Sequence, residues 1–312
     1  MDNQNIKNHP LYRAHTIDTA INSLWDFYRK NFTKLFAMSL IMAAILQYAA
    51  SFIDLTLLQN ETDINVLMER LREFIVPVGI IAFINLFFSV IIQHYILFNP
   101  LDENSSIFNS VSGSFRYLLP YIITVILFAF FAGMAIALGL VIFIVGAVFA
   151  IIYTVTLYLF ILPVMMMENT DIGHTISRTF KLTYKNFWSN FGWVAVFLTL
   201  FILISFLISG LILVPFAGNF LQSIFNPDEA ANIAEVSKTP LYIALSTVAG
   251  AVTMPLMPLF SAILYFNGRA KEENMQGNIS GNEERKITVE DLYAKPYFND
   301  SPDNYERKQE SD

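Results

Sequence analysis

The sequence predicts an all-α integral membrane protein with six transmembrane helices, arranged as three repeated units of interfacial helix plus helical hairpin. Three observations carry this prediction. Of the 312 residues, 55% are hydrophobic and only 14% are charged, and the mean hydropathy is +0.50. The apolar residues gather in long runs, and a short amphipathic pattern recurs ahead of some of them. Such a composition lies on the apolar side of an ordinary soluble domain.

The long apolar runs define the membrane domain, which we place at 17–267. A hydrocarbon core about 30 Å thick needs roughly 20 residues of helix. The run 118–167 is long enough for two crossings, so we expect it to fold back near Gly139–Gly146. The alternative is a single re-entrant helix there, which would reverse the orientation of everything downstream. The six expected spans are 35–58, 74–98, 118–139, 143–167, 191–216 and 241–266.

The positions of lysine and arginine set the expected orientation. Short cytoplasmic loops are enriched in these residues. With six spans and a cytoplasmic N-terminus, all but Arg70, Arg72 and Lys238 of the 19 basic residues lie on the cytoplasmic side. Both termini are therefore expected in the cytoplasm. The first run, from Leu35, has no small-residue cleavage pattern, so we expect it to remain in the mature protein.

Polar segments flank the membrane domain at 1–16 and 268–312. The second is rich in Asn, Glu and Lys, so we expect a disordered cytoplasmic tail. Its string "ITVEDLYAKPYF" groups apolar and aromatic residues in acidic surroundings. Either this is a docking motif for a protein partner or it is a weakly adhesive disordered segment. The candidate docking residues are Leu292, Tyr293, Tyr297 and Phe298.

An internal repeat connects the amphipathic segments. Ile17–Phe36 aligns without gaps on Ile172–Phe191, and a weaker copy begins at Ile107. In each copy two aliphatic residues and one aromatic residue recur at i, i+4 and i+8, which forms one narrow apolar face on a helix. We expect interfacial helices at 17–33, 107–117 and 171–188. True repetition implies a pseudo-threefold bundle, whereas the alternative is a chance similarity between ordinary interfacial helices.

One stretch has a family resemblance. The string "FILPVMMMENTDIGHTISRTFKLTYKNFW" resembles a signature of the bacterial glycerophosphoryl diester phosphodiesterase membrane-domain superfamily and its stand-alone relatives. The matching residues are Pro163, Glu168, Ile172, Ile176, Arg178, Thr179, Phe180 and Leu182. The string "AILYFNGRAKEE" looks like the family's closing pattern through Tyr265, Arg269 and Glu272, and it departs at Asn267 and Gly268.

The resemblance covers about 17–273 and implies a protein of the bacterial cytoplasmic membrane. In fused relatives a separate soluble domain carries the phosphodiesterase chemistry, which needs paired histidines and carboxylates around a divalent cation. The sequence of this chain contains no such domain. The resemblance therefore implies a membrane fold without that enzymatic activity.

Few residues in the sequence suggest a catalytic, metal-binding or ligand-binding role. The absence of cysteine excludes thiolate nucleophiles, iron–sulfur clusters and cysteine-ligated zinc, and none of the four histidines has a metal-binding partner at i+3 or i+4. We therefore expect no cofactor, no metal and no nucleic-acid partner. Polar positions in or near the spans are the remaining candidates. They are Gln47, Asp54, Asn85, Gln93, His94, Glu168 and Arg178.

Two pairs among these candidates have alternative interpretations. Gln47 and Asn85 are expected to form an interhelical hydrogen bond, with a substrate site as the alternative. Glu168 and Arg178 are close enough in sequence for a salt bridge across the turn before 171–188, and two solvated charges are the alternative.

These observations favour a non-enzymatic interaction, assembly or regulatory module of the bacterial cytoplasmic membrane. Its expected partners are the lipid bilayer and a protein that contacts the cytoplasmic interfacial helices or the tail. The main alternative is a transporter or exporter of a small or lipid-like solute. A lipid-modifying membrane enzyme is the third.

Overall fold

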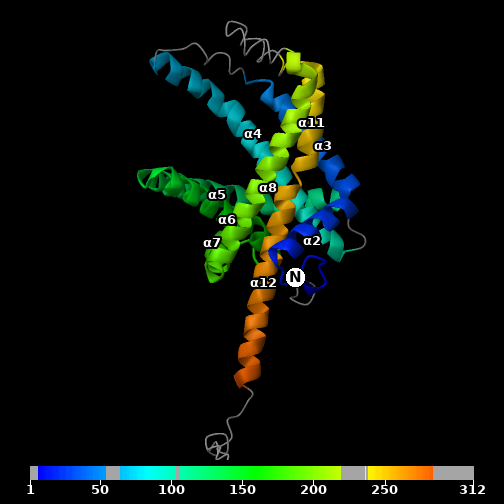
Figure 1. The fold of residues 1–312 in the computed structure, drawn as a ribbon, viewed down its shortest axis with the longest axis vertical. Coiled ribbons are helices and arrows are strands. Elements are labelled where there is room, and N and C mark those ends of the chain that lie inside the picture. Colours follow the sequence, from blue (N-terminus) through cyan, green and yellow to red (C-terminus); the bar gives the residue numbers. More distant parts are fainter. Residues whose placement is uncertain (1–5, 54–63, 103–105, 219–235, 237, 284–312) are drawn as a thin grey trace, which may run out of the picture. The chain divides into compact units, whose positions relative to one another are not determined.

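The structure is a computed structural model that describes residues 6–53, 64–102, 106–218, 236 and 238–283. Within these ranges every regular element is a helix and no strand occurs. The chain divides into two compact units, Met1–Lys271 and Glu272–Asp312. The fold and the sites below belong to the described residues of the first unit (Figure 1).

The described helices, in chain order, are α2 (Ile17–Lys30), α3 (Phe32–Ala50), α4 (Ile64–Phe98), η2 (Asn99–Leu101), α5 (Ile107–Val141), α6 (Phe143–Met167), α7 (Ile172–Lys185), α8 (Phe187–Leu213), η3 (Val214–Phe216), α11 (Pro240–Thr253) and α12 (Leu256–Glu283).

Six described segments are long and apolar enough to cross a membrane. They are Phe32–Ala50, Ile64–Leu101, Ile107–Val141, Phe143–Met167, Phe187–Phe216 and Pro240–Asn274. The predictions of an all-α class and of six membrane-length apolar helices are therefore confirmed. The sixth segment is interrupted between α11 and α12, beside Pro255, which has no backbone N–H to continue the helix.

The helices α2 and α7 have matching boundaries. Each has 14 residues and begins after a side chain that caps it, Thr16 for α2 and Asp171 for α7. Oxygens of these side chains accept hydrogen bonds from backbone N–H groups of the first turn, which otherwise have no partner. A single asparagine, Asn31 or Asn186, then separates each helix from the next one. These bounds follow the sequence alignment of Ile17–Phe36 with Ile172–Phe191.

The second amphipathic segment has a different form. An interfacial helix was expected at 107–117 with a span starting at 118, but α5 continues without a break from Ile107 to Val141. When the three segments are aligned, Tyr121 of α5 takes the position of Asn31 and Asn186, and its side chain is buried. The helix continues past Pro120, and no single-residue joint forms at this position.

The run 118–167 folds back as expected. α5 ends at Val141 and α6 begins at Phe143, whose φ of 67° lies in the left-handed region. On the two sides of this turn the backbones approach closely at Gly139 and Gly146. A Cβ atom added to Gly139 would lie only 2.6 Å from the carbonyl oxygen of Gly146. Two helices can approach so closely only where glycine removes the side chain. The sequence signal at Gly139–Gly146 therefore marks a close-packed helical hairpin.

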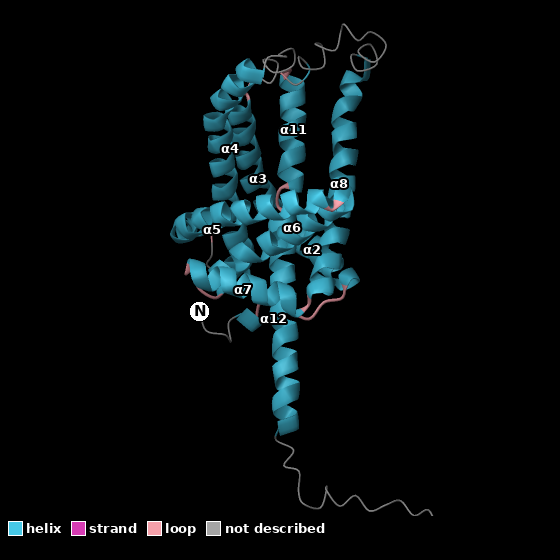
Figure 2. Ribbon diagram, turned by 90° about the vertical axis from the view of Figure 1, so that its left-hand side faces the viewer, coloured by secondary structure: helices cyan, strands magenta, loops and turns pink. Residues whose placement is uncertain are grey.

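The hairpin α5–α6 runs at a steep angle to α4, α8 and α11 in both views (Figures 1 and 2). Its tip, residues 138–145, exposes large apolar side chains except at Gly139. Only the base of the hairpin reaches the common core, through residues such as Tyr121 and Phe160. Above the base, Phe149 of α6 stacks on Phe191 of α8 with ring centroids 4.5 Å apart. The pseudo-threefold bundle stays a prediction.

The core lies where the later halves of α4 and α6 meet the first half of α12. Its largest fully buried side chains include Tyr95, Phe160 and Tyr265. Phe197 of α8 stacks on Phe260 of α12 with ring centroids 4.0 Å apart. Away from this core the long helices expose rows of large apolar side chains. Such surfaces are rare on soluble proteins but normal on helices that face lipid.

Candidate functional site

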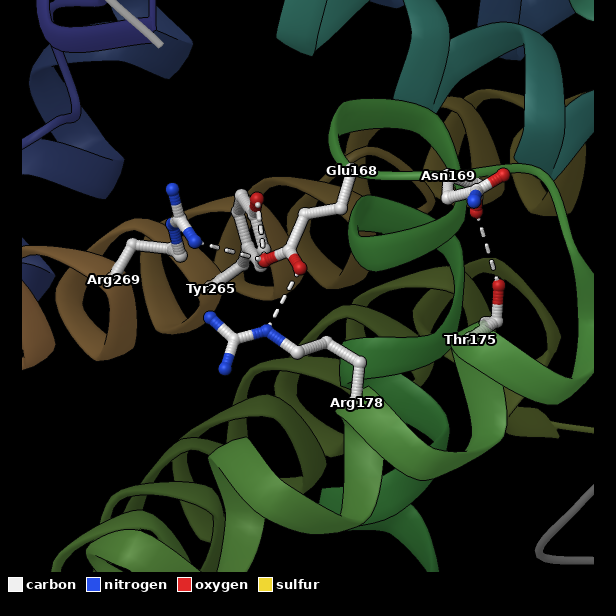
Figure 3. A network of polar contacts seen from close by, with 6 residues as sticks. All are labelled: Glu168, Asn169, Thr175, Arg178, Tyr265 and Arg269. Carbon is white, nitrogen blue, oxygen red and sulfur yellow. Dashed lines mark hydrogen bonds and ion pairs between the residues drawn. The ribbon is translucent and has the colours of Figure 1, made fainter.

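Glu168 is the centre of a polar network that joins three helices (Figure 3). It lies at the C-terminal end of α6, and one carboxylate oxygen accepts a hydrogen bond from Nε of Arg178 on α7 at 2.7 Å. The other oxygen accepts one from the Tyr265 hydroxyl on α12 at 3.2 Å. Nη1 of Arg269, one turn further along α12, is 3.5 Å from the same oxygen. The expected salt bridge between Glu168 and Arg178 is therefore present.

The network is largely shielded from solvent. The side chains of Glu168, Arg178 and Arg269 are 12%, 11% and 16% exposed. Removing charges from water is costly unless several hydrogen bonds compensate, and both oxygens of this carboxylate have partners. Loss of one partner would leave a poorly solvated charge behind. The geometry therefore fixes the positions of α7 and α12 relative to the end of α6.

Further contacts hold the two ends of α7. At its start, the Thr175 hydroxyl donates to the carbonyl oxygen of Asn169 at 3.2 Å, next to the Glu168 network (Figure 3). At its end, the buried Asn190 amide donates to the carbonyl oxygens of Leu182 and Thr183 at 3.1 and 3.3 Å. These are carbonyl groups that the last turn of a helix leaves without partners. The whole length of α7 is thus fastened to the membrane helices.

The shared apolar stripe has different surroundings in α7 and α2. In α7, Ile176 and Phe180 pack against the core, and Phe180 lies 6.0 Å from the ring centroid of Phe128 on α5. In α2, Ile21 and Trp25 are exposed. The α2 stripe therefore remains available to a membrane surface, while that of α7 is already used in packing.

The N-terminal segment contains two buried histidines, His9 and His15. His9 accepts a hydrogen bond from the N–H of Leu11 through Nδ1, so its other ring nitrogen, Nε2, donates to the carbonyl oxygen of Ile96 at 3.0 Å. The N–H of His15 donates to the Asn267 side-chain oxygen at 2.9 Å. This polar segment therefore folds back onto α4 and α12.

Burial affects the protonation of groups in and near this segment. It lowers the pKa of His9 from 6.5 to about 4, and the hydrogen bond to Ile96 opposes the shift only in part. Burial also lowers the pKa of His15. On α2, burial raises the pKa of Tyr28 to about 12, and its hydroxyl donates to the carbonyl oxygen of Val252 at 2.8 Å. All three groups are therefore neutral near pH 7.

The other predicted site residues do not join the Glu168 network. No hydrogen bond links Gln47 and Asn85 within the described part of the chain. Gln47 lies in the last turn of α3, whereas Asn85 lies more than halfway along α4 on an exposed face. The antiparallel course of the two helices separates them, so the expected interhelical bond does not form.

His94 has a packing role. Its ring lies 4.4 Å from that of Phe98 and faces Gly113 of α5, where an added Cβ atom would lie 2.6 Å from Nε2. Gly113 therefore makes room for the imidazole between α4 and α5.

Some predicted residues lie outside the described part of the chain. They are Asp54 and the candidate docking residues Leu292, Tyr293, Tyr297 and Phe298. Among the residues that are described, no group of three or more His, Asp or Glu side chains is placed to hold a metal ion.

Sequence reasoning did not anticipate the docking of His9 and His15. Their partners are distant in the chain, so no local pattern marks them. Gln93, a polar candidate within the second span, continues a polar series with Asn85 and Ser89 at four-residue spacing on α4.

The described part of the chain defines the class of the protein: it is helical throughout its regular elements and has six helices long and apolar enough to cross a membrane. Comparisons with protein-family models, curated proteins and solved structures found no match for it. The resemblance to the glycerophosphoryl diester phosphodiesterase membrane-domain superfamily stays a prediction. Residues of both quoted motifs contact one another in the Glu168 network: Glu168 comes from the first motif, and Tyr265 and Arg269 come from the second.

Proposed function

We propose that this chain is a non-enzymatic multi-pass protein of the bacterial cytoplasmic membrane that acts as an interaction, assembly or regulatory module. Both termini face the cytoplasm. The observation that carries the proposal is the Glu168 network, which holds the amphipathic helix α7 against α6 and α12.

The chemistry of the network supports anchoring. Both carboxylate oxygens of Glu168 accept hydrogen bonds, and their donors come from two other helices. A general base would need a carboxylate oxygen that reaches a substrate proton. Here the same atoms hold α7 and α12, so their contribution is geometric.

The outward side of α7 suits a partner surface. Lys181, Tyr184, Lys185 and, just beyond the helix, Trp188 are exposed. Aromatic and basic side chains together are typical of the membrane–water interface. A helix fixed in place loses less conformational entropy when a partner binds, because it is already ordered. An acidic surface of a protein partner at the membrane is the complement that these charges favour.

The α2 helix supplies a second surface of the same kind. It exposes Trp25, Arg29 and Lys30, and Tyr28 ties it to the carbonyl oxygen of Val252. The matching lengths and caps of α2 and α7 support a repeated interfacial unit. We therefore propose two cytoplasmic platforms built on one pattern, with the segment 107–117 as a diverged third copy.

Site-specific cross-linking in cells tests the proposal. A photoreactive benzophenone side chain at Lys181 should capture one dominant protein. The same group at Val145, on the apolar tip of the α5–α6 hairpin, is the matched control and should capture lipid. Adducts with lipid alone at both positions would refute the module. Replacing Arg178 by Leu should lower the yield from position 181, because α7 loses its ion pair.

A further inference from the structure

A cavity of about 240 Å³ lies where all six candidate spans meet. Each span contributes to its lining, through Met42, Gln93, Tyr121, Tyr158, Phe201 and Ser261. An apolar cavity of about 150 Å³ already accepts benzene, whereas whole drug-sized ligands need roughly 300–1,000 Å³. The space therefore suits one segment of an amphiphilic molecule.

A polar stripe on α4 runs along the cavity. Asn85, Ser89 and Gln93 are spaced four residues apart, so they lie on one face of the helix. At a rise of about 1.5 Å per residue the stripe is about 12 Å long. Asn85 is exposed, whereas Gln93 is 1% exposed. The cavity thus leads from an exposed helix face to a buried polar end.

The buried end offers hydrogen-bond donors. The side-chain nitrogen of Gln93 has no hydrogen-bond acceptor among the described residues. The Tyr121 hydroxyl donates to the Tyr158 hydroxyl at 2.9 Å, so the proton of Tyr158 is directed elsewhere. A buried donor without a partner is expensive, at about 1–3 kcal/mol. The buried end of the cavity therefore favours a ligand that has a hydrogen-bond acceptor.

The backbone beside the cavity is interrupted. Met254, between α11 and α12, and Met257 and Pro258 in the first turn of α12 all line it. Irregular backbone at membrane depth is tolerated where it lines a cavity or is buried in protein. Methionine side chains adapt their shape to an apolar guest. No charged side chain belongs to the described lining, so a charged group would have no counter-ion there.

We propose that this cavity binds a neutral amphiphile through a carbonyl oxygen, as presented by the ester group of an acyl lipid. The carbonyl oxygen has two lone pairs, which match the amide of Gln93 and the hydroxyl of Tyr158. The hydrocarbon chain extends along Met42 and Met257 toward Asn85 and the lipid-facing surface. This site adds a lipid ligand to the protein and does not depend on the proposed cytoplasmic partner.

A matched pair of probes tests the carbonyl contact. The full chain in a nonionic detergent is titrated with 1-lauroylglycerol, an ester, and with 1-O-dodecylglycerol, the ether that lacks the carbonyl. Bound probe is counted by native mass spectrometry. The wild-type chain should prefer the ester by about three- to tenfold, the ratio expected for one or two hydrogen bonds. Gln93→Leu should reduce that preference, because only the Tyr158 hydroxyl remains as a donor.

Two further variants separate the site from general effects. Gln47→Leu makes the same change on α3, away from the cavity, and should leave the preference intact. Ser89→Phe fills the cavity and should weaken the binding of both probes. The variant chain should still elute as the wild type does in size-exclusion chromatography. Equal binding of ester and ether to the wild type would overturn the proposal. So would an unchanged preference in Gln93→Leu, or a cavity that holds water alone.

The same titration identifies the source of the carbonyl. If dilauroyl phosphatidylcholine, which has no net charge, displaces 1-lauroylglycerol, the ligand is an acyl chain of a bilayer phospholipid. If it does not, the ligand is a free neutral ester. Either result supports the acyl carbonyl site. Cross-linking from position 181 should be the same in Gln93→Leu, so failure of the lipid site and failure of the module are distinguishable.

Discussion

Acidification should release the N-terminal segment from the membrane helices. His9 is buried and holds this segment through hydrogen bonds to Ile96 and from Leu11. The bond from Leu11 requires the neutral ring, because protonated Nδ1 cannot accept it. Burial lowers its pKa from 6.5 to about 4. The released segment therefore binds a proton more readily than the docked segment. Docking is most stable above pH 6.5 and weakens as the pH falls toward 4.

The size of the effect follows from the shift in pKa. One pKa unit corresponds to about 1.36 kcal/mol. Between pH 7.5 and pH 5.5 docking should lose on the order of 1 kcal/mol from His9 alone, and roughly 2–3 kcal/mol by pH 4.5. Burial lowers the pKa of His15 as well, so its contribution has the same sign. The loss at pH 5.5 is about a tenfold change in the docking equilibrium.

The amide hydrogen of Leu11 is the reporter, because it donates directly to Nδ1 of His9. Its hydrogen exchange, corrected for the intrinsic rate at each pH, should speed up about tenfold from pH 7.5 to 5.5. His9→Gln keeps a donor for the Ile96 carbonyl oxygen but cannot titrate, so its pH dependence should shrink to the part from His15. His174→Gln alters an exposed histidine and is the control. Equal corrected exchange at both pH values would refute the reasoning.

Three other perturbations have defined outcomes. Glu168→Gln should lower the free energy of unfolding in detergent by about 2–3 kcal/mol, because Arg178 loses its anionic partner; the double change with Arg178→Gln should cost less than the sum of the single changes. An additive pair would argue against the ion pair. Phe143→Gly should raise the thermal midpoint, since φ is 67° there and the left-handed conformation costs other residues about 1–2 kcal/mol. A lower midpoint would contradict the strain. Single cysteines at Asn109 and Lys181, in a chain that otherwise has none, should react with an impermeant maleimide only from the cytoplasmic side. Labelling from outside would overturn the orientation.

The membrane-length helices were predictable because their signal is local. Run length and apolar composition decide whether a helix can span lipid, and both can be read from adjacent residues. The turn at 139–146 followed from two glycines in a run too long for one crossing. The contact of Glu168 with Arg178 was also accessible, because only ten residues separate them.

The rest depends on contacts between distant segments. The N-terminal segment looked like a polar extension, yet His15 bonds to Asn267, 252 positions away. No periodicity in 1–16 encodes that contact. The continuity of α5 depends on the absence of a helix-ending asparagine, which is a subtler signal than the apolar stripe that all three segments share. The angle of the α5–α6 hairpin depends on its packing against α7 and α8, which includes the contact of Phe149 with Phe191, and sequence spacing contains no information about it.

The single residues Asn31 and Asn186 have a mechanical consequence. A joint of one residue has only two soft torsions, so a span cannot tilt without turning the amphipathic helix attached to it. Membrane helices tilt when the surrounding bilayer thins or thickens. Such a tilt of α8 would press on α7, which Glu168 ties to two other helices. A change in bilayer thickness that tilts α8 should therefore reorient α7 through Asn186.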